Sequence, residues 1–148
     1  MLYYLIYFSK ATQLMSDEAL EVLLKQARTR NREFVITGML VYVEGKAGIH
    51  KYARFVQVLE GSRFLVESLF EKISKDGRHW DIVVLKRAAI SKRNFKSWDM
   101  GFEWIDLESS PQLQSFFAIS EDTITDEFRN SDAVLEFLKK FNGQSQLR

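Results

Sequence analysis

The 148-residue sequence has no cysteine, one proline and only two histidines. Without cysteine, the chain can form no disulfide, no thiolate nucleophile and no cysteine-ligated metal site. His50 and His79 offer few ligands for a conventional metal centre, so we expect none. The sequence also lacks a run of about eighteen apolar residues, and its opening stretch, Leu2 to Phe8, is too short for a secretory leader. These absences favour a cytoplasmic protein with no membrane partner.

An excess of charge of either sign is also missing. Twenty-one basic residues face twenty acidic ones, which leaves a net charge of +1. No overall field therefore attracts the chain to nucleic acid or to an anionic membrane, and we expect small molecules or proteins as partners. The length, with 46% hydrophobic and 14% aromatic residues, suits one compact domain with a short appendage.

Hydrophobic periodicity predicts alternating strands and helices. We expect strands at 2–8, 35–43, 55–60, 82–85 and within 95–104, and helices at 16–31, 62–76 and 131–141. This order predicts an α+β, ferredoxin-like βαββαβ fold with an added fifth strand and a C-terminal helical extension. The break at 108–111 separates a domain at 1–105 from the extension at 106–148. The apolar stripe of the last helix (Val134, Leu135, Leu138 and Phe141) would cover the bare side of the sheet or another subunit.

One connection in this pattern is unusually long. It starts at Glu44 and passes through Lys46, Gly48 and His50 before the strand at Phe55. Hairpin loops usually have about two to five residues, so we expect an extended loop here.

The strand from Phe55 to Leu59 is apolar except for Gln57 at its centre. A carboxamide cannot be buried without hydrogen-bond partners. Neighbouring backbone groups could satisfy it. Alternatively, because an amide carries a donor and an acceptor, its rotation or tautomerisation would reverse a local hydrogen-bond pattern, and Gln57 would act as a switch.

Six short motifs occur together in one order. They are Leu5–Ser9, Ala27–Asn31, Ile36–Gly38, Phe55–Gly61, Asp76–His79 and Arg93–Met100. In this order and spacing, the chain resembles the BLUF family of blue-light receptors over roughly residues 2–104. The resemblance implies a non-covalently bound flavin, FAD or FMN, between the two helices and over the sheet. Its walls would be Leu20, Leu24, Val66 and Phe70.

The resemblance also implies a set of cofactor-binding residues. Asn31 would read the pyrimidine edge of the flavin, whereas its sequence position alone suggests a helix C-cap. Asp76, Arg78 and His79 would meet the ribityl chain and phosphate, with Lys72 nearby; the alternative is a surface turn. The basic residues before Asn31, including Arg30, are interpreted as a solvated helix end.

The resemblance implies a second set of residues, which would form a light switch. Tyr7 would supply an electron and a proton, and Gln57 would rearrange its bonds to the flavin, so no covalent link to the chain is needed. Trp98 and Met100 would carry the change outward. The resemblance implies a sensor without enzymatic activity, which signals to an unidentified protein or through its own homo-oligomer.

Two departures from the family pattern and two alternative functions remain. The stretch from Lys46 to Ala53 is longer than usual, and Ala27 stands where relatives often have serine. An acylphosphatase-like hydrolase would share the fold and use Arg78 or Asn31 on a phosphate, although no glycine-rich loop follows the first strand. A ferredoxin-like interaction module, such as one that binds RNA, is disfavoured by the balanced charge.

Overall fold

The structure is a computed structural model that describes residues 1–106, 124–130 and 132–139, with backbone only at 47 and 100–106. Its elements follow one another in the predicted order, except that a short helix that was not predicted, Asp126–Asn130, precedes the last one. They are β1 (Leu2–Ala11), α1 (Asp17–Glu33), β2 (Thr37–Ala47), β3 (His50–Ser62), α2 (Arg63–Ser74), β4 (His79–Ile90), β5 (Trp98–Asp106), α4 (Asp126–Asn130) and α5 (Ala133–Lys139).

Five strands form one mixed sheet in the order β4-β1-β3-β2-β5. The first four pair antiparallel, as in a ferredoxin-like fold, and β5 joins the edge parallel to β2. This confirms the predicted α+β fold with its fifth strand. β1 lies between β4 and β3, which explains why both of its faces are apolar.

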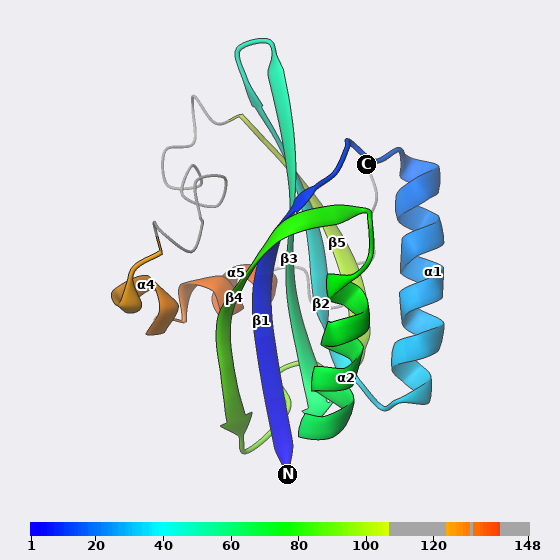
Figure 1. The fold of residues 1–148 in the computed structure, drawn as a ribbon, viewed down its shortest axis with the longest axis vertical. Coiled ribbons are helices and arrows are strands. Elements are labelled where there is room, and N and C mark those ends of the chain that lie inside the picture. Colours follow the sequence, from blue (N-terminus) through cyan, green and yellow to red (C-terminus); the bar gives the residue numbers. More distant parts are fainter. Residues whose placement is uncertain (107–123, 131, 140–148) are drawn as a thin grey trace.

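Helices cover both faces of the sheet (Figure 1). α1 and α2 lie on one face, where Ser16 caps α1 by accepting a 3.1 Å hydrogen bond from the Ala19 amide. On the other face, Val134 and Leu138 of α5 are fully buried against the sheet core. The predicted stripe of the last helix therefore packs on the bare side of the sheet. Phe141 lies outside the described residues.

The prediction of a long loop after Glu44 is wrong. β2 and β3 continue as a regular antiparallel pair up to Ala47 and His50, and only Gly48 and Ile49 form the turn. Gly48 has φ +61°, in the left-handed region that a two-residue hairpin turn requires. The paired strands form an arm that extends beyond the rest of the sheet (Figure 1).

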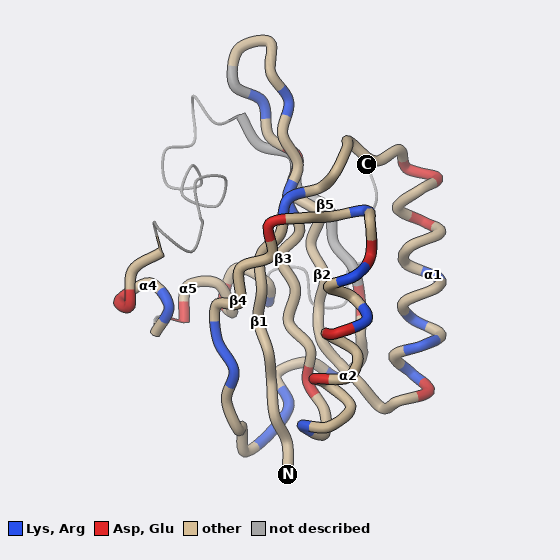
Figure 2. The backbone as a smooth tube through the Cα atoms, viewed as in Figure 1, with Lys and Arg blue, Asp and Glu red and all other residues tan. Residues whose placement is uncertain are grey.

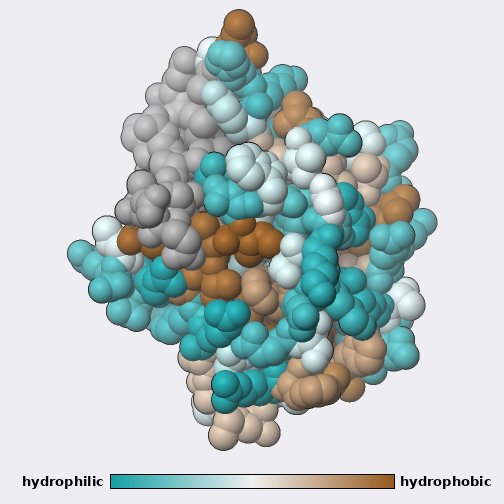
Figure 3. Space-filling view, viewed as in Figure 1, coloured by the Kyte–Doolittle hydropathy of each residue, from teal (hydrophilic) through white to brown (hydrophobic). Residues whose placement is uncertain are grey.

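Charges of both signs are interspersed along α1 and α2 (Figure 2), and the surface over these helices is largely hydrophilic (Figure 3). Hydrophobic side chains gather instead in the region of α5 and β4. Within the described ranges, no helix has the length and apolar character needed to cross a membrane.

Candidate functional site

A pocket lies between α1, α2 and the face of the sheet that these helices cover. Its apolar lining consists of Leu23, Ala27, Leu40, Phe55, Ile73 and Trp98. Its polar lining consists of Tyr7, Arg30, Gln57, Asp76, Arg78 and His79. The pocket thus brings together six of the eight predicted site residues.

Tyr7 and Gln57 form a buried hydrogen bond in this lining. The two residues are opposite each other on β1 and β3, and the Tyr7 hydroxyl donates to Gln57 Oε1 at 2.7 Å. The side chains are only 2% and 3% exposed. Burial raises the pKa of Tyr7, and the Asp76 carboxylate raises it further, so the phenol keeps its proton. The acceptor of Gln57 is therefore satisfied by a phenol rather than by neighbouring backbone.

Asn31 lies inside α1 rather than at its end. The helix continues to Glu33 and is capped by Phe34, so the predicted C-cap role of Asn31 is wrong. Its side chain is 0% exposed, yet neither Oδ1 nor Nδ2 has a hydrogen-bond partner among the described residues. Leaving a buried polar group unsatisfied costs about 1–3 kcal/mol. Asn31 is not among the residues that line the pocket, so the structure leaves both ends of this buried amide unsatisfied.

Two donors in the pocket lining are buried without a hydrogen-bond partner among the described residues. They are the Trp98 indole Nε1 and the Arg30 Nε. The placement of Arg30 corrects the prediction of a solvated helix end, because its guanidinium is half-buried and lines the pocket. Burial lowers the pKa of Arg30, and the nearby Arg78 lowers it further. These two donors leave unused hydrogen-bonding capacity in the pocket lining, and Asn31 follows Arg30 directly on α1.

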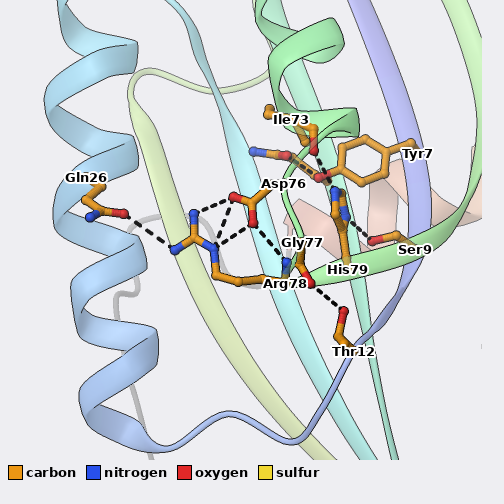
Figure 4. A network of polar contacts seen from close by, with 10 residues as sticks. Tyr7, Ser9, Thr12, Gln26, Ile73, Asp76, Gly77, Arg78 and His79 are labelled. Carbon is orange, nitrogen blue, oxygen red and sulfur yellow. Dashed lines mark hydrogen bonds and ion pairs between the residues drawn. The ribbon is translucent and has the colours of Figure 1, made fainter.

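Asp76 and Arg78 form an ion pair in the turn between α2 and β4 (Figure 4). Asp76 Oδ1 accepts hydrogen bonds from the Arg78 backbone amide and from Arg78 Nε, each at 2.9 Å. These bonds with the guanidinium hold the pKa of Asp76 below its usual range. Arg78 Nη1 also reaches Gln26 Oε1 on α1 at 3.4 Å. The turn is thus a wall of the pocket that an ion pair organises, where the sequence left open a simple surface turn.

His79 lines the pocket, but both of its ring nitrogens bond to the protein (Figure 4). Nε2 lies 2.7 Å from the Ile73 carbonyl oxygen, and Nδ1 lies 2.7 Å from Ser9 Oγ. Because a carbonyl only accepts, Nε2 carries a proton, and in the neutral ring Nδ1 accepts from Ser9. His79 therefore ties the end of α2 to β1. Lys72 is exposed and lies outside the lining.

The four residues predicted to form the apolar walls of the flavin pocket are not among those that line it. Leu20, Leu24 and Val66 are buried in the core, but Leu23 and Ala27 line the pocket. Phe70 packs its ring 5.5 Å from that of Tyr7. The signal for the true wall on α1 is the i, i+4, i+7 spacing of Leu23, Ala27 and Arg30, which places them on one helix face.

The two switch residues expected on β5 are described to different depths. Trp98 is buried and lines the pocket beside Gln57. Met100 pairs by its backbone with Leu40 of β2, and its side chain lies outside the described part. The neighbouring Asp99 forms an ion pair with Arg28, which connects the start of β5 to α1.

Comparison with known proteins places this site in a family. The BLUF family, described as sensors of blue light using FAD, matches residues 2–101. A photoactivated adenylate cyclase subunit beta of Euglena longa is 32% identical over 121 residues, which are 82% of this chain and 13% of that subunit. The chain therefore spans only a small fraction of the curated relatives that it matches.

Solved structures agree with this match. The dark-state structure of the BLUF protein BlrB is 26% identical to this chain and has a TM-score of 0.62. The alignment covers 94% of this chain and 96% of the BlrB chain. The structure of Klebsiella pneumoniae BlrP1 with FMN and cyclic diGMP is 30% identical and has a TM-score of 0.58. This alignment covers 93% of this chain and 35% of the BlrP1 chain. The family match extends over more than half of the sequence, and this chain therefore belongs to the BLUF family of flavin-binding blue-light sensors.

Proposed function

We propose that this chain is a non-enzymatic light sensor that holds FAD or FMN in the pocket between α1 and α2. The main support for this proposal is the buried hydrogen bond from the Tyr7 hydroxyl to Gln57 Oε1 in the pocket lining. A phenol and a carboxamide in this arrangement form a pair whose hydrogen-bond pattern has two alternatives.

The unused polar groups around the pocket fit a flavin. The unpartnered Asn31 amide would pair with the alternating donors and acceptors of the pyrimidine edge, and Arg30 and Trp98 offer two further donors. Arg78 would meet the phosphate, while Asp76 holds its guanidinium in position. A bound flavin would supply blue-light absorption and, once excited, the capacity to take up an electron.

The switch itself would involve the residues of this chain. In the dark, Tyr7 would keep its proton, and its hydroxyl would donate a hydrogen bond to Gln57 Oε1. After transient movement of an electron and a proton from Tyr7, the Gln57 amide would rotate or tautomerise and exchange its donor and acceptor ends. Because the two residues are strand partners, this exchange requires no displacement of the backbone of β1 or β3.

We infer that β5 carries the signal outward. Trp98 lines the same pocket as Gln57, so a change of the amide alters its surroundings. The next residue, Asp99, is ion-paired to Arg28 on α1, and Met100 follows on the same strand. Repacking at this edge would shift the population between two arrangements that a separate signalling protein or a second copy of the chain distinguishes.

The alternatives with the same sheet topology explain less of this site. A phosphate-binding hydrolase would use Arg78, but it does not require a buried tyrosine–glutamine pair. An RNA-binding module needs exposed aromatic and basic residues on the sheet, whereas α1 and α2 cover the face that carries Tyr7, Phe55 and Gln57.

Absorption spectroscopy tests the proposal. We expect the purified chain to take up FAD or FMN and its visible absorption to move to the red in blue light and to recover in darkness. Tyr7→Phe should bind flavin but lose the shift, because its ring has no hydroxyl. Tyr4→Phe is the matched control, because Tyr4 lies on β1 but packs on the opposite face of the sheet. A chain that takes up neither flavin, or a normal shift in Tyr7→Phe, would contradict the proposal.

A further inference from the structure

A second hollow, of about 480 Å³, lies where the end of β1, the base of the β2–β3 arm and the start of β4 meet. Its volume falls within the range of roughly 300–1,000 Å³ that is typical of small-molecule sites. Among the described residues, it shares no lining residue with the pocket between α1 and α2. The charged and aromatic side chains of its lining are Lys10, Lys51, Tyr52, Arg54 and Trp80.

Two aromatic side chains of this lining are open to solvent. Trp80 is 56% exposed and Tyr52 is 47% exposed. Lys10 is the strand partner of Trp80, and its Nζ lies 5.0 Å from the centroid of the indole ring. This cation–π contact holds the indole at the hollow. Exposed, positioned aromatic rings offer faces on which a flat base can stack.

The same lining is basic. It contains Lys10, Lys51 and Arg54, and none of its ten residues is acidic. Asp81 lies outside the lining and forms a 2.9 Å ion pair with Lys10. Arg54 is buried, so Lys10 and Lys51 are the cations of this lining that the phosphate groups of a ligand would contact.

The hollow adjoins the phosphate end of the proposed flavin pocket. The Thr12 amide donates a 2.9 Å hydrogen bond to the Arg78 carbonyl oxygen, and Thr12 Oγ1 donates to the Gly77 carbonyl oxygen at 2.7 Å (Figure 4). Thr12 lines the second hollow, and Arg78 lines the first pocket. The two sites therefore meet along one hydrogen-bonded contact between the β1–α1 connection and the turn before β4.

We propose that the second hollow binds an adenylate group, with its adenine on the aromatic rings of Trp80 and Tyr52 and its phosphates on Lys10 and Lys51. This ligand chemistry has two sources. One is the adenylate half of FAD, which rests on the proposed flavin site, and the other is a free adenine nucleotide. In either case, the β2–β3 arm gains a role, because it supplies Lys51 and Tyr52.

Calorimetric titration of the FMN-loaded chain with ADP tests the proposal. We expect saturable binding that weakens by about tenfold or more in Trp80→Ala and in Lys51→Gln. Phe64→Ala and Lys25→Gln are matched controls, because both side chains are exposed and lie on α2 and α1, away from the hollow. Affinities for FAD and FMN are compared in the same variants.

The arms of this experiment separate the two sources. If the adenylate half of FAD fills the hollow, the chain prefers FAD over FMN, FAD-loaded protein rejects ADP, and Trp80→Ala removes the preference. If free nucleotide is the source, ADP binds the FAD-loaded and FMN-loaded forms alike. The proposal is overturned when ADP does not bind and the chain binds FAD and FMN with equal affinity. It is also overturned when Trp80→Ala and Lys51→Gln change neither the affinity for ADP nor the preference for FAD. A chain that takes up no flavin contradicts the proposed sensor function, and ADP titration of that chain still tests the hollow.

Discussion

Tyr7 and Gln57 are directly opposed on β1 and β3, and the Tyr7 hydroxyl donates a 2.7 Å hydrogen bond to Gln57 Oε1 in a pocket wall. The register of two central strands fixes this pair, so its geometry depends on the sheet rather than on a loop. A polar pair held by rigid backbone can change its hydrogen bonds while the fold stays constant. This property is what the proposed sensor requires.

Removal of the buried amide at position 31 should weaken flavin binding. Asn31→Ala deletes a side chain that has no hydrogen-bond partner among the described residues, and we expect flavin affinity to fall by about 10- to 100-fold. The same change should not lower the melting temperature of the flavin-free protein, because no internal hydrogen bond is lost. Fluorescence titration and thermal unfolding measure the two effects. Thr29→Ala, exposed on the same helix, is the control, and unchanged affinity in Asn31→Ala would refute the role.

A buried carboxylate on β3 should stabilise the connection that leads to β5. Glu60 is fully buried and accepts hydrogen bonds from the backbone amides of Asn94 and Phe95 and from Asn94 Nδ2. Because Glu60→Ala leaves these donors unsatisfied, we expect it to lower the free energy of unfolding by about 3 kcal/mol. Glu71→Ala, at an exposed ion pair with Lys75, should cost less than about 0.5 kcal/mol. Equal urea midpoints for the two variants would disprove this assignment.

The turn before β4 should contribute a pH-dependent part of stability. The pKa of Asp76 is lowered in the folded protein, mainly by its hydrogen bonds with Arg78. Its contribution is therefore complete above the ordinary carboxyl pKa of about 4 and is lost as the pH falls through the lowered value. We expect Asp76→Asn to be less stable than wild type at pH 7, with a smaller difference at pH 3. A difference that grows on acidification would contradict this sign.

The tip of the arm offers a test of backbone conformation. Gly48 has φ +61°, and a Cβ there would meet nothing within 4 Å, so Gly48→Ala carries a conformational cost alone. That cost should be about 1 kcal/mol. Gly77→Ala is the matched control, because its Cβ would also be unobstructed and its φ lies outside the left-handed region. Chemical denaturation of both variants should show a loss only for Gly48→Ala, and equal stability of the two would be inconsistent with this turn.

The sequence predicts the order of strands and helices along the chain and the two covering helices, because their apolar residues follow strand and helix periods. It fails at the β2–β3 arm. There, most residues between Glu44 and Arg54 are polar, glycine or alanine, so pairing leaves no hydrophobic alternation to detect. The strands are specified instead by their mutual hydrogen bonds and by the turn at Gly48.

The candidate site shows a similar division. Tyr7 and Gln57 could be predicted because a family motif surrounds each of them. Arg30 could not, since a buried arginine and a solvated one look alike at the basic end of a helix. The bonds of His79 to Ser9 and to Ile73 also had no signal, because a side-chain hydrogen bond to a distant residue or to a carbonyl leaves no sequence period.

The most direct test of the central claim is the light-minus-dark absorption spectrum of Gln57→Leu. Leucine has nearly the same volume but neither a donor nor an acceptor, so it cannot exchange hydrogen bonds with Tyr7 or with a flavin. The account predicts that flavin remains bound to this variant and that blue light no longer shifts its absorption to the red. A reversible red shift of wild-type size in Gln57→Leu would contradict the account.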